Sequence, residues 1–322
     1  MKNIFLQFND NPYSGIVAFT NRLAESSSRK LDVIHHNEIN WFDIFISPKI
    51  IILNFPNISV RKVYVLLFLL IAKICGNKIK LIVHEVESQS VKGRILLRYL
   101  LRLSNIVYSV SPGIKGALLE IMCYKKPIKL LIQGSNIPVI NNSSPSIDKF
   151  VISIVGNALN HDHTYLDNIL KSVAIYNSKN NNKVSIQFMG LKNSKFYDEY
   201  LKKYSSNILI KVLDGLSDID FSKVLLDTNL VMLPIYDGFS ARRSSIVTSL
   251  THGIPCLVPP PTSKYEEDWL TYNHLPGLYF TSNFSESDIY AFLECDVSCL
   301  NIKERAREVF SYANSANTLL EP

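Results

Sequence analysis

The fold of this protein can be predicted from residues 231–258, which read VMLPIYDGFSARRSSIVTSLTHGIPCLV. The apolar segment VML ends at Pro234 and predicts a strand, and a turn containing Asp237 and Gly238 follows it. Two arginines among serines stand where a helix should begin, and Gly253 and a second apolar segment, CLV, come after that helix. The order strand, turn, helix, strand predicts a βαβ crossover whose ligand edge lies at the carboxyl end of the first strand.

The turn before this helix has the composition of a diphosphate site. Arg242 and Arg243 each carry a guanidinium fork that can hold phosphate oxygens with two hydrogen bonds. The first N–H groups of a helix point outward at its amino end, where the helix dipole adds roughly half a positive charge. A serine here is often only a cap, and paired arginines are often only solvated. A glycine, two arginines and several hydroxyls in one turn favour an anion site.

Length and composition indicate a globular protein with two domains. The 322 residues suit two domains of about 150 residues each, and 47% of the residues are hydrophobic while 19% are charged. The five cysteines are scattered without metal-ligand spacing, which is typical of reduced thiols in a cytosolic protein. The opening MKNIFLQFND has the length of a strand and no cleavage site, so we do not interpret it as a secretory signal.

Charge is distributed unevenly along the chain. Residues 1–148 contain 18 Lys and Arg against 9 Asp and Glu, whereas residues 149–322 contain 16 against 19. A basic domain indicates nucleic acid, anionic lipid or another anionic ligand as a partner. The sequence contains no pattern typical of a helix-turn-helix, an RRM or a zinc finger, so we predict no nucleic-acid partner.

Two apolar helices are predicted in the basic half. Residues 63–75, VYVLLFLLIAKIC, are bounded by basic residues and are shorter than the roughly 20 residues that cross a bilayer, so this helix is either buried or interfacial. Residues 92–102, KGRILLRYLLR, combine an apolar stripe with four cations. Such a helix can lie on an anionic membrane. A core helix with a solvated arginine face explains the same pattern.

Strand and helix signals alternate along both halves of the chain. The apolar segments read NIFLQF, LDVIHH, KIIILNF, KLIVHE and NIVYSVS in the first half, and FVISIVG, VSIQFMG and ILIKVLDG before the crossover in the second. We therefore predict an α/β protein with two Rossmann-like, doubly wound domains that face each other across a cleft. The predicted domains cover 1–140 and 149–300 and are joined by the linker-like NNSSPSIDK. Residues 301–322 should form a helix, over 302–320, that packs back toward the N-terminal domain.

Seven segments stand in a characteristic order along the chain: SGIVAFTNRLAE, VHE, SNIVYSVS, QGSNIP, ISIVGNA, LPIYDGFSARRSSIVTSLTHGIPCLV and FSYANSANTLL. In this order they resemble the GT-B glycosyltransferases. Within that fold the chain resembles the retaining, nucleotide-sugar-dependent enzymes of bacterial surface polysaccharide synthesis, the family 4-like group. The resemblance covers most of the chain, and the arginine-serine segment is its most specific part.

The resemblance implies roles for individual residues. His84 and Glu85 would face the transferred sugar or the acceptor, and Asp237 would bond sugar hydroxyls, which makes these three the catalytic candidates. The order of the motifs favours a functional His84 over a histidine bonded within the core. For the donor, the implied residues are Gly15, Gly156, Asn157, Gly215, Leu216, Gly238, Phe239, Ser240, Arg242, Arg243, Ser244, Ser245 and Thr248.

The chain departs from the family pattern at two places. Relatives carry an Arg and a Lys just after the Gly156 position, where residues 158–164 here read ALNHDHT, so Arg242 and Arg243 would have to supply that charge. Relatives also carry a pair of glutamates in the segment that holds the arginines. Asp237 stands at the first position, and Thr248 replaces the second.

The resemblance implies transfer of a sugar from a nucleoside diphosphate sugar to an acceptor hydroxyl, with retention, in capsule, O-antigen, lipopolysaccharide or exopolysaccharide synthesis. We expect no metal and no other cofactor, because helix ends and guanidinium groups can stabilise the leaving diphosphate. The expected partners are a nucleotide sugar, a saccharide or polyprenyl-diphosphate-linked oligosaccharide acceptor, and an anionic membrane surface, with the protein cytoplasmic and peripheral on the inner face of the membrane. A GT-B epimerase and a non-catalytic glycosyltransferase-like partner protein are the alternatives.

Overall fold

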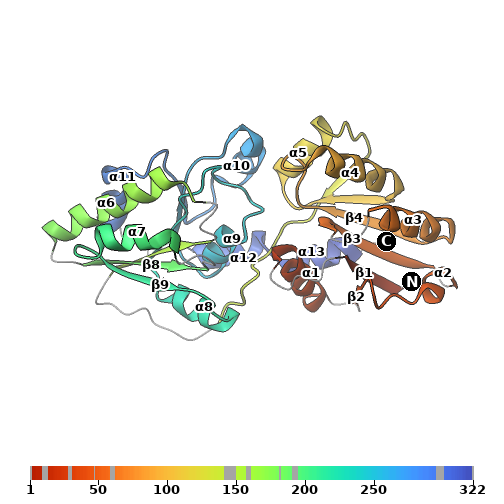
Figure 1. Ribbon diagram of the computed structural model, residues 1–322, viewed down its shortest axis with the longest axis horizontal. Coiled ribbons are helices and arrows are strands. Elements are labelled where there is room, and N and C mark those ends of the chain that lie inside the picture. The colour runs from red at the N-terminus through yellow and green to blue at the C-terminus, as the bar shows by residue number, and fades with distance from the viewer. Residues whose placement is uncertain are drawn as a thin grey trace. The chain divides into compact units, whose positions relative to one another are not determined.

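The computed structural model describes residues 2–8, 14–27, 31–46, 48–58, 62–140, 150–156, 161–180, 183–190, 195–294 and 301–320. The chain forms two compact units, Met1–Asn136 with Ser311–Pro322, and Ile137–Phe310 (Figure 1). Each unit contains a six-stranded parallel sheet with helices between its strands. The predicted α/β class with two Rossmann-like domains is confirmed.

In the N-terminal unit the strands lie in the order β2-β1-β3-β4-β5-β6. They are β1 (Lys2–Phe8), β2 (Leu31–His35), β3 (Lys49–Ile58), β4 (Lys78–Val83), β5 (Ile106–Ser109) and β6 (Ile128–Leu130). The helices are α1 (Gly15–Glu25), α2 (Trp41–Ile46), α3 (Lys62–Ile74), α4 (Val91–Leu103) and α5 (Pro112–Glu120). Only the β1-to-β2 connection runs toward the β2 edge, so right-handed crossovers place α1 on one face of the sheet and α2 to α5 on the other.

The end of the chain differs from its prediction. Residues 302–320 form two helices, α12 (Ile302–Val309) and α13 (Tyr312–Leu320), because the backbone leaves the helical region at Phe310, where φ is −100° and ψ is 67°. Helix α12 belongs to the C-terminal unit, and α13 belongs to the N-terminal unit, where it packs against α1.

Buried polar groups hold α13 in the N-terminal unit. The fully buried Lys80 donates from Nζ to the carbonyl of Leu319 at 2.6 Å, and Tyr108 Oη donates to the carbonyl of Thr318 at 3.4 Å. These donors satisfy carbonyls of the last helical turn, and the ammonium lies at the negative end of the helix dipole.

In the C-terminal unit the strand order is β12-β11-β10-β7-β8-β9. The strands are β7 (Phe150–Val155), β8 (Val184–Met189), β9 (Leu209–Leu213), β10 (Leu230–Met232), β11 (Cys256–Val258) and β12 (Leu278–Phe280). The helices are α6 (His163–Lys179), α7 (Lys195–Tyr204), α8 (Asp218–Leu226), α9 (Ser244–Thr251), α10 (Glu266–Tyr272), α11 (Glu286–Glu294) and α12. Strands β10 and β11 pair in parallel on either side of α9 in sequence, which confirms the predicted βαβ crossover.

Candidate functional site

The candidate site lies at the carboxyl ends of β7 and β10. These strands are neighbours, and the sheet extends from β7 toward β9 in one direction and from β10 toward β12 in the other. The segments that follow them meet, since Asp162 N–H donates to the carbonyl of Pro234 at 2.6 Å and His161 pairs with Ile235 in an antiparallel bridge. Ligands of parallel α/β sheets bind outside such a switch point.

Gly238 shapes the turn after β10. Its φ is 70°, and a Cβ at this position would lie 2.0 Å from the carbonyl oxygen of Pro260. Both the backbone conformation and the lack of space therefore require glycine. The next residue, Phe239, is fully buried edge-on against Phe280, with ring centroids 5.6 Å apart.

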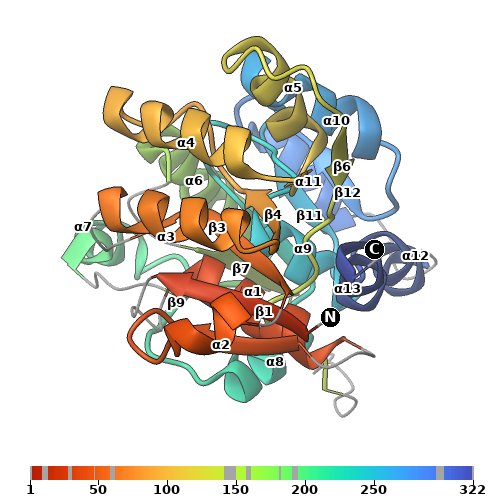
Figure 2. The ribbon, with the colours of Figure 1, turned by 90° about the vertical axis from the view of Figure 1, so that its right-hand side faces the viewer.

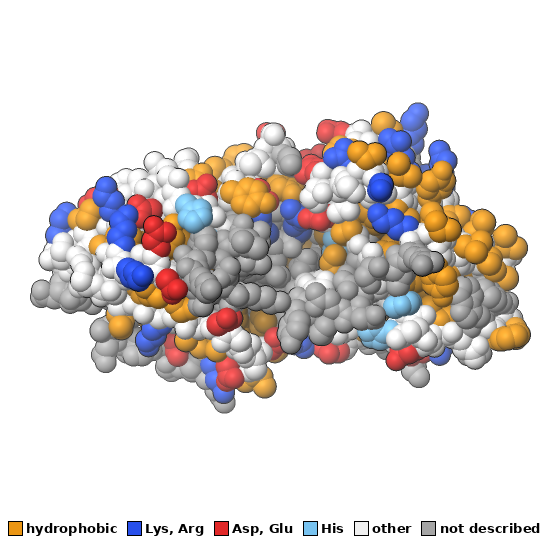
Figure 3. All heavy atoms as spheres, viewed as in Figure 1, with side chains coloured by type: hydrophobic (Ala, Val, Ile, Leu, Met, Phe, Trp, Pro, Cys, Tyr) orange, Lys and Arg blue, Asp and Glu red, His pale blue; other side chains and the backbone are white. Residues whose placement is uncertain are grey.

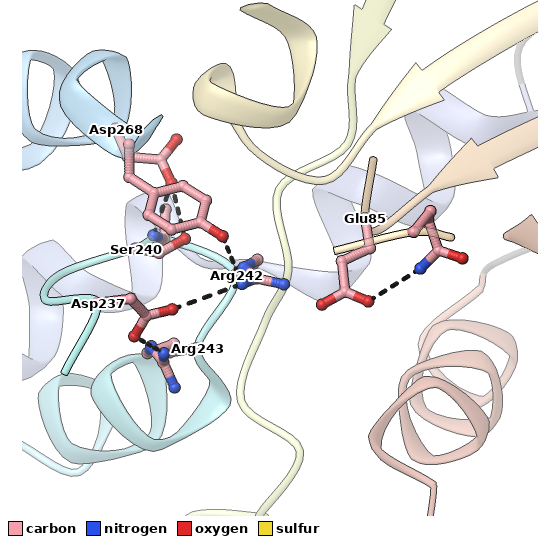
Figure 4. Close-up of polar contacts among 9 residues, drawn as sticks. Glu85, Asp237, Ser240, Arg242, Arg243 and Asp268 are labelled. Atoms are coloured by element: carbon pink, nitrogen blue, oxygen red, sulfur yellow. Dashed lines mark hydrogen bonds and ion pairs between the residues drawn. The ribbon is translucent and has the colours of Figure 1, made fainter. Parts of the chain in front are cut away.

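Asp268 of α10 holds the following part of the turn (Figure 4). Its fully buried carboxylate accepts hydrogen bonds from Ser240 Oγ and from Ala241 N–H, both at 3.0 Å. Sequence analysis missed Asp268 because it lies 28 residues beyond Ser240. Asp268 is the acid of the segment EEDW that falls on the inner face of α10. Because buried carboxylates are rare without hydrogen-bond partners, its position on that face was the only sequence pattern that could have indicated its role.

Arg242 and Arg243 meet at the carboxylate of Asp237 (Figure 4). Arg243 donates from Nη2 to Asp237 Oδ1, and Arg242 Nη2 lies 3.8 Å from Asp237 Oδ2. Arg242 also donates to Tyr265 Oη at 2.5 Å and lies over that ring, 5.0 Å from its centroid. All three charged side chains are 15–19% exposed, so this cluster holds one net positive charge in a largely buried place.

Arg243 also carries a donor for which no described residue provides an acceptor. Within the described residues, its Nε is buried and has no hydrogen-bond acceptor. Arg243 is the N-cap residue of α9, and the described structure shows neither a side-chain cap nor an acidic residue in the first turn of that helix. A buried donor without an acceptor is costly and rare. Together with the helix amino end, it makes this turn the candidate anion site of the C-terminal unit.

His161 is the second residue that sequence analysis missed. Burial lowers its pKa to about 4; the hydrogen bond to the carbonyl of Val155 opposes this shift, and the charge of Arg243 adds to it. Nε2–H donates to that carbonyl at 3.4 Å, and Nδ1 accepts from Tyr197 Oη at 3.1 Å. His161 is therefore neutral at pH 7. This histidine therefore adds no positive charge to the segment after Gly156.

The other residues predicted for the donor fall into three groups. Gly156 ends β7 with φ 123°, Gly215 follows β9 with φ 66°, and Leu216 is half-buried after it. Ser244 and Ser245 are half-buried in the first turn of α9. The side chains of Phe239, Ser240 and Thr248 are buried, so only their backbone could reach a ligand. Asn157 lies outside the described residues.

His84 in the N-terminal unit belongs to a buried polar chain that joins three elements. Thr20 of α1 donates to the carbonyl of Ile16 at 2.9 Å and accepts from Asn54 Nδ2 of β3 at 2.7 Å. Asn54 Oδ1 lies 2.9 Å from His84 Nε2, just after β4. Because the Asn54 amide nitrogen donates to Thr20, its oxygen accepts, and the His84 proton lies on Nε2. The ring of His84 also packs edge-on against Phe19.

Glu85 and Gly15 complete the predicted residues of this unit. The carboxylate of Glu85 is half-buried and accepts a hydrogen bond from Gln89 Nε2 at 3.2 Å (Figure 4). Gly15 begins α1, and a Cβ there would meet none of the described residues, so neither packing against them nor the backbone conformation requires a glycine. His84 and Glu85 lie at the carboxyl end of β4, the edge at which ligands of this fold bind.

No family model matches this sequence, and no curated protein matches it either. Solved structures match it along almost the whole chain. HepE from Anabaena, in complex with UDP, shares 14% identity at a TM-score of 0.66 and covers 99% of this chain and 98% of its own. The lipopolysaccharide outer core galactosyltransferase WaaB shares 12% identity at a TM-score of 0.63, with the same coverage. The fold is GT-B.

The GT-B likeness does not separate transferases from epimerases. One similar structure comes from Listeria monocytogenes and is described as that of a protein assigned as a UDP-N-acetylglucosamine 2-epimerase. It shares 11% identity with this chain at a TM-score of 0.64, and the match covers 99% of this chain and 95% of the Listeria chain. At these identities the likeness establishes the fold alone. The reaction has to be argued from the residues of the site.

Proposed function

We propose that this protein is a metal-independent, retaining glycosyltransferase that moves a sugar from a nucleoside diphosphate sugar to an acceptor hydroxyl. The observation that carries the proposal is the Arg242–Arg243 pair at the amino end of α9, with the buried Nε of Arg243 unsatisfied within the described residues. Two structures with similar folds, HepE from Anabaena and MnaA from S. aureus, contain UDP, which has the diphosphate that this pair would bind.

The reaction needs groups that stabilise the negative charge that develops on the leaving diphosphate. Breaking the bond between the anomeric carbon and oxygen places that charge on the phosphates, and fixed cations and N–H dipoles stabilise it most effectively where water is excluded. Arg242, Arg243 and the first N–H groups of α9 are such groups. Asp237 contacts both guanidinium groups, which supports a positioning role in addition to the sugar contact predicted for it.

His84 and Glu85 are proposed to meet the sugar or the acceptor. The hydrogen bond with Asn54 fixes the His84 ring and its tautomer, as a residue that orients a substrate requires. Glu85 keeps a half-buried carboxylate at the end of β4. Gly15 is proposed to let phosphate approach the amino end of α1.

The proposed pathway is the synthesis of a capsule, O-antigen, lipopolysaccharide or exopolysaccharide, with a saccharide or polyprenyl-diphosphate-linked oligosaccharide as the acceptor. The excess of 9 positive charges in residues 1–148 supports an anionic acceptor. WaaB, which has the same fold, is a lipopolysaccharide galactosyltransferase. We place the protein in the cytoplasm, at the inner face of the membrane.

The test is donor turnover by the R242A/R243A double variant. Loss of a single preorganised donor in an anion hole lowers turnover by about 10²–10³-fold, and we expect at least this loss here. Arg305→Gln is the matched control, because Arg305 is 57% exposed in the same unit and pairs only with Glu308 among the ion pairs of the described residues. A folded double variant that transfers sugar at the wild-type rate would contradict the proposal.

The epimerase is the second candidate, because the Listeria structure has the same fold. An epimerase converts the nucleotide sugar without an acceptor, whereas a transferase releases nucleoside diphosphate when an acceptor is present. Chromatography of the products with and without acceptor separates the two. The absence of binding by every nucleotide and nucleotide sugar in a panel favours the third alternative, a non-catalytic glycosyltransferase-like partner protein.

A further inference from the structure

Helix α3 is apolar on both of its faces. Its inner face packs into the core of the N-terminal unit with Val65, Phe68, Leu69 and Ala72, all of which are fully buried. Its outer face is a continuous exposed stripe at helical spacing, formed by Val63 (77% exposed), Leu67 (56%), Leu70 (46%) and Ile74 (77%). A helix that is hydrophobic all round is normally buried on all sides, and an exposed apolar patch of this kind marks an interaction surface.

Helix α4 lies beside α3 and continues the exposed surface with cations (Figure 2). Lys73 Nζ of α3 donates to the carbonyl of Leu103 at 2.6 Å, which ties the two helices together. The exposed side chains of α4 alternate between apolar and basic along one stripe: Val91, Lys92, Ile95, Arg98, Tyr99 and Arg102. Neither helix contains an acidic residue. We call the outer surface of these two helices the α3–α4 face.

A basic pocket opens beside the carboxyl end of α4. It has a volume of about 480 Å³, and its lining includes no acidic residue among those described. Arg98 and Arg102 belong both to this pocket and to the α3–α4 face. The remaining residues of the lining are Leu101, Met122, Cys123, Tyr124, Lys125 and Lys126. Four cations around an apolar floor suit a phosphate group attached to a hydrocarbon chain.

We propose that the α3–α4 face docks on an anionic lipid bilayer, with the α3 stripe at the boundary between head groups and acyl chains and the basic pocket around a lipid phosphate. Amphipathic helices that combine cations with large apolar side chains bind membranes in this way. Phe42 and Ile46 of α2, a helix on the same face of the sheet as α3 and α4, are exposed as well. Figure 3 shows hydrophobic and basic side chains mixed at the upper right of the view, where Figure 1 labels α3 and α4. Among the described residues no helix is long and apolar enough to span the bilayer.

The charges argue against a second copy of this chain as the occupant. A twofold interface places the same surface patch on both subunits, so the basic residues of α4 would face each other without acidic partners on this face. An anionic bilayer supplies the missing negative charge. It also supplies a boundary in which the α3 stripe leaves water.

The test is co-sedimentation of the full chain with lipid vesicles. We expect binding to phosphatidylcholine vesicles that contain about one third phosphatidylglycerol, weaker binding in about 0.5 M salt, and little binding to phosphatidylcholine alone. Each cation near such a surface contributes about fivefold to partitioning, so R98Q/R102Q should lower it roughly 25-fold. L67S/L70S, which removes the middle of the α3 stripe, should lower it at least about tenfold.

Matched controls lie in the C-terminal unit. L209S/I219S removes two apolar side chains that are 50% and 55% exposed, and K202Q/K211Q removes two exposed lysines. Both controls should bind vesicles like the wild type. Equal losses in test and control variants, or equal binding to both kinds of vesicle, would contradict the proposal. So would a lipid-free dimer, seen by light scattering, that L67S/L70S converts to a monomer while no vesicle binding occurs. The experiment uses no nucleotide sugar, so its outcome is independent of the proposed transferase activity.

Discussion

Asp237 and Arg243 form an ion pair at the N-cap of helix α9, and each side chain is less than one fifth exposed. The pair neutralises one of the two arginine charges and fixes the direction of the guanidinium fork. The geometry of the candidate anion site therefore depends on a carboxylate that need not touch the diphosphate itself.

Asp237→Asn should preserve the shape of the side chain and remove its charge. The two guanidinium groups then lose their shared counterion, so we expect the free energy of unfolding to fall by about 1–3 kcal/mol. Nucleoside diphosphate should still bind, because both arginines remain, whereas donor turnover should fall. Urea unfolding, calorimetric titration and a turnover assay measure these three effects. Asp220→Asn is the control, since Asp220 is 56% exposed; wild-type donor turnover by folded D237N would disprove the positioning role.

Asp268→Ala should loosen the turn that carries the arginines. The substitution leaves Ser240 Oγ and Ala241 N–H buried without their acceptor, and an unsatisfied buried group costs about 1–3 kcal/mol. We therefore expect a loss of about 2–5 kcal/mol in the free energy of unfolding. Nucleoside diphosphate should also protect the variant less against thermal unfolding. Asp268→Asn keeps one acceptor oxygen and should lose less; equal stability of D268A and the wild type would refute the anchoring role.

The substitutions Gly238→Ala and Gly215→Ala separate the cost of a positive φ from the cost of a steric clash with the new Cβ. Both glycines have positive φ, 70° and 66°, but only the Cβ at Gly238 would meet backbone, while the Cβ at Gly215 would meet open space. We expect G215A to lower the free energy of unfolding by about 1 kcal/mol and G238A by at least about 3 kcal/mol. Thermal and urea unfolding measure both. Similar losses would mean that the turn moves freely to admit a methyl group.

The free energy of unfolding should fall as the pH is lowered from 6.5 to about 4, because His161 is buried in its neutral form. Its pKa of about 4 in the folded protein is below its ordinary value of 6.5, so between these pH values the unfolded chain binds more protons than the folded one. The contribution is complete above pH 6.5 and is lost as the pH falls toward 4. From pH 6.5 to 5 the loss should be about 2 kcal/mol.

The variant H161Q isolates this contribution. It should flatten the pH dependence of urea unfolding between pH 4 and 6.5, although burial also lowers the pKa of His252, which remains in the variant. Equal slopes in wild type and H161Q would show that His161 binds protons as readily in the folded protein as in the unfolded chain.

Local patterns predicted the fold and the arginine turn. The crossover from β10 through α9 to β11 could be predicted because Pro234 and Gly253 mark its boundaries within a short stretch of chain. The break after Phe310 could not, since the hydrophobic pattern continues through it and the partners of α13 are strand residues far earlier in the chain. Asp268 and His161 were missed for the same reason: their roles come from contacts between elements, and no local spacing encodes them.

The account depends on the claim that Arg242 and Arg243 hold the diphosphate of a nucleotide. Calorimetric titration with a nucleoside and with its diphosphate, on the wild type and on R242A/R243A, tests this claim directly. We predict that the wild type binds the diphosphate at least about 100-fold more tightly than the nucleoside, and that the double variant loses most of this difference while it still binds the nucleoside. If a folded double variant keeps the full preference for the diphosphate, the claim is wrong.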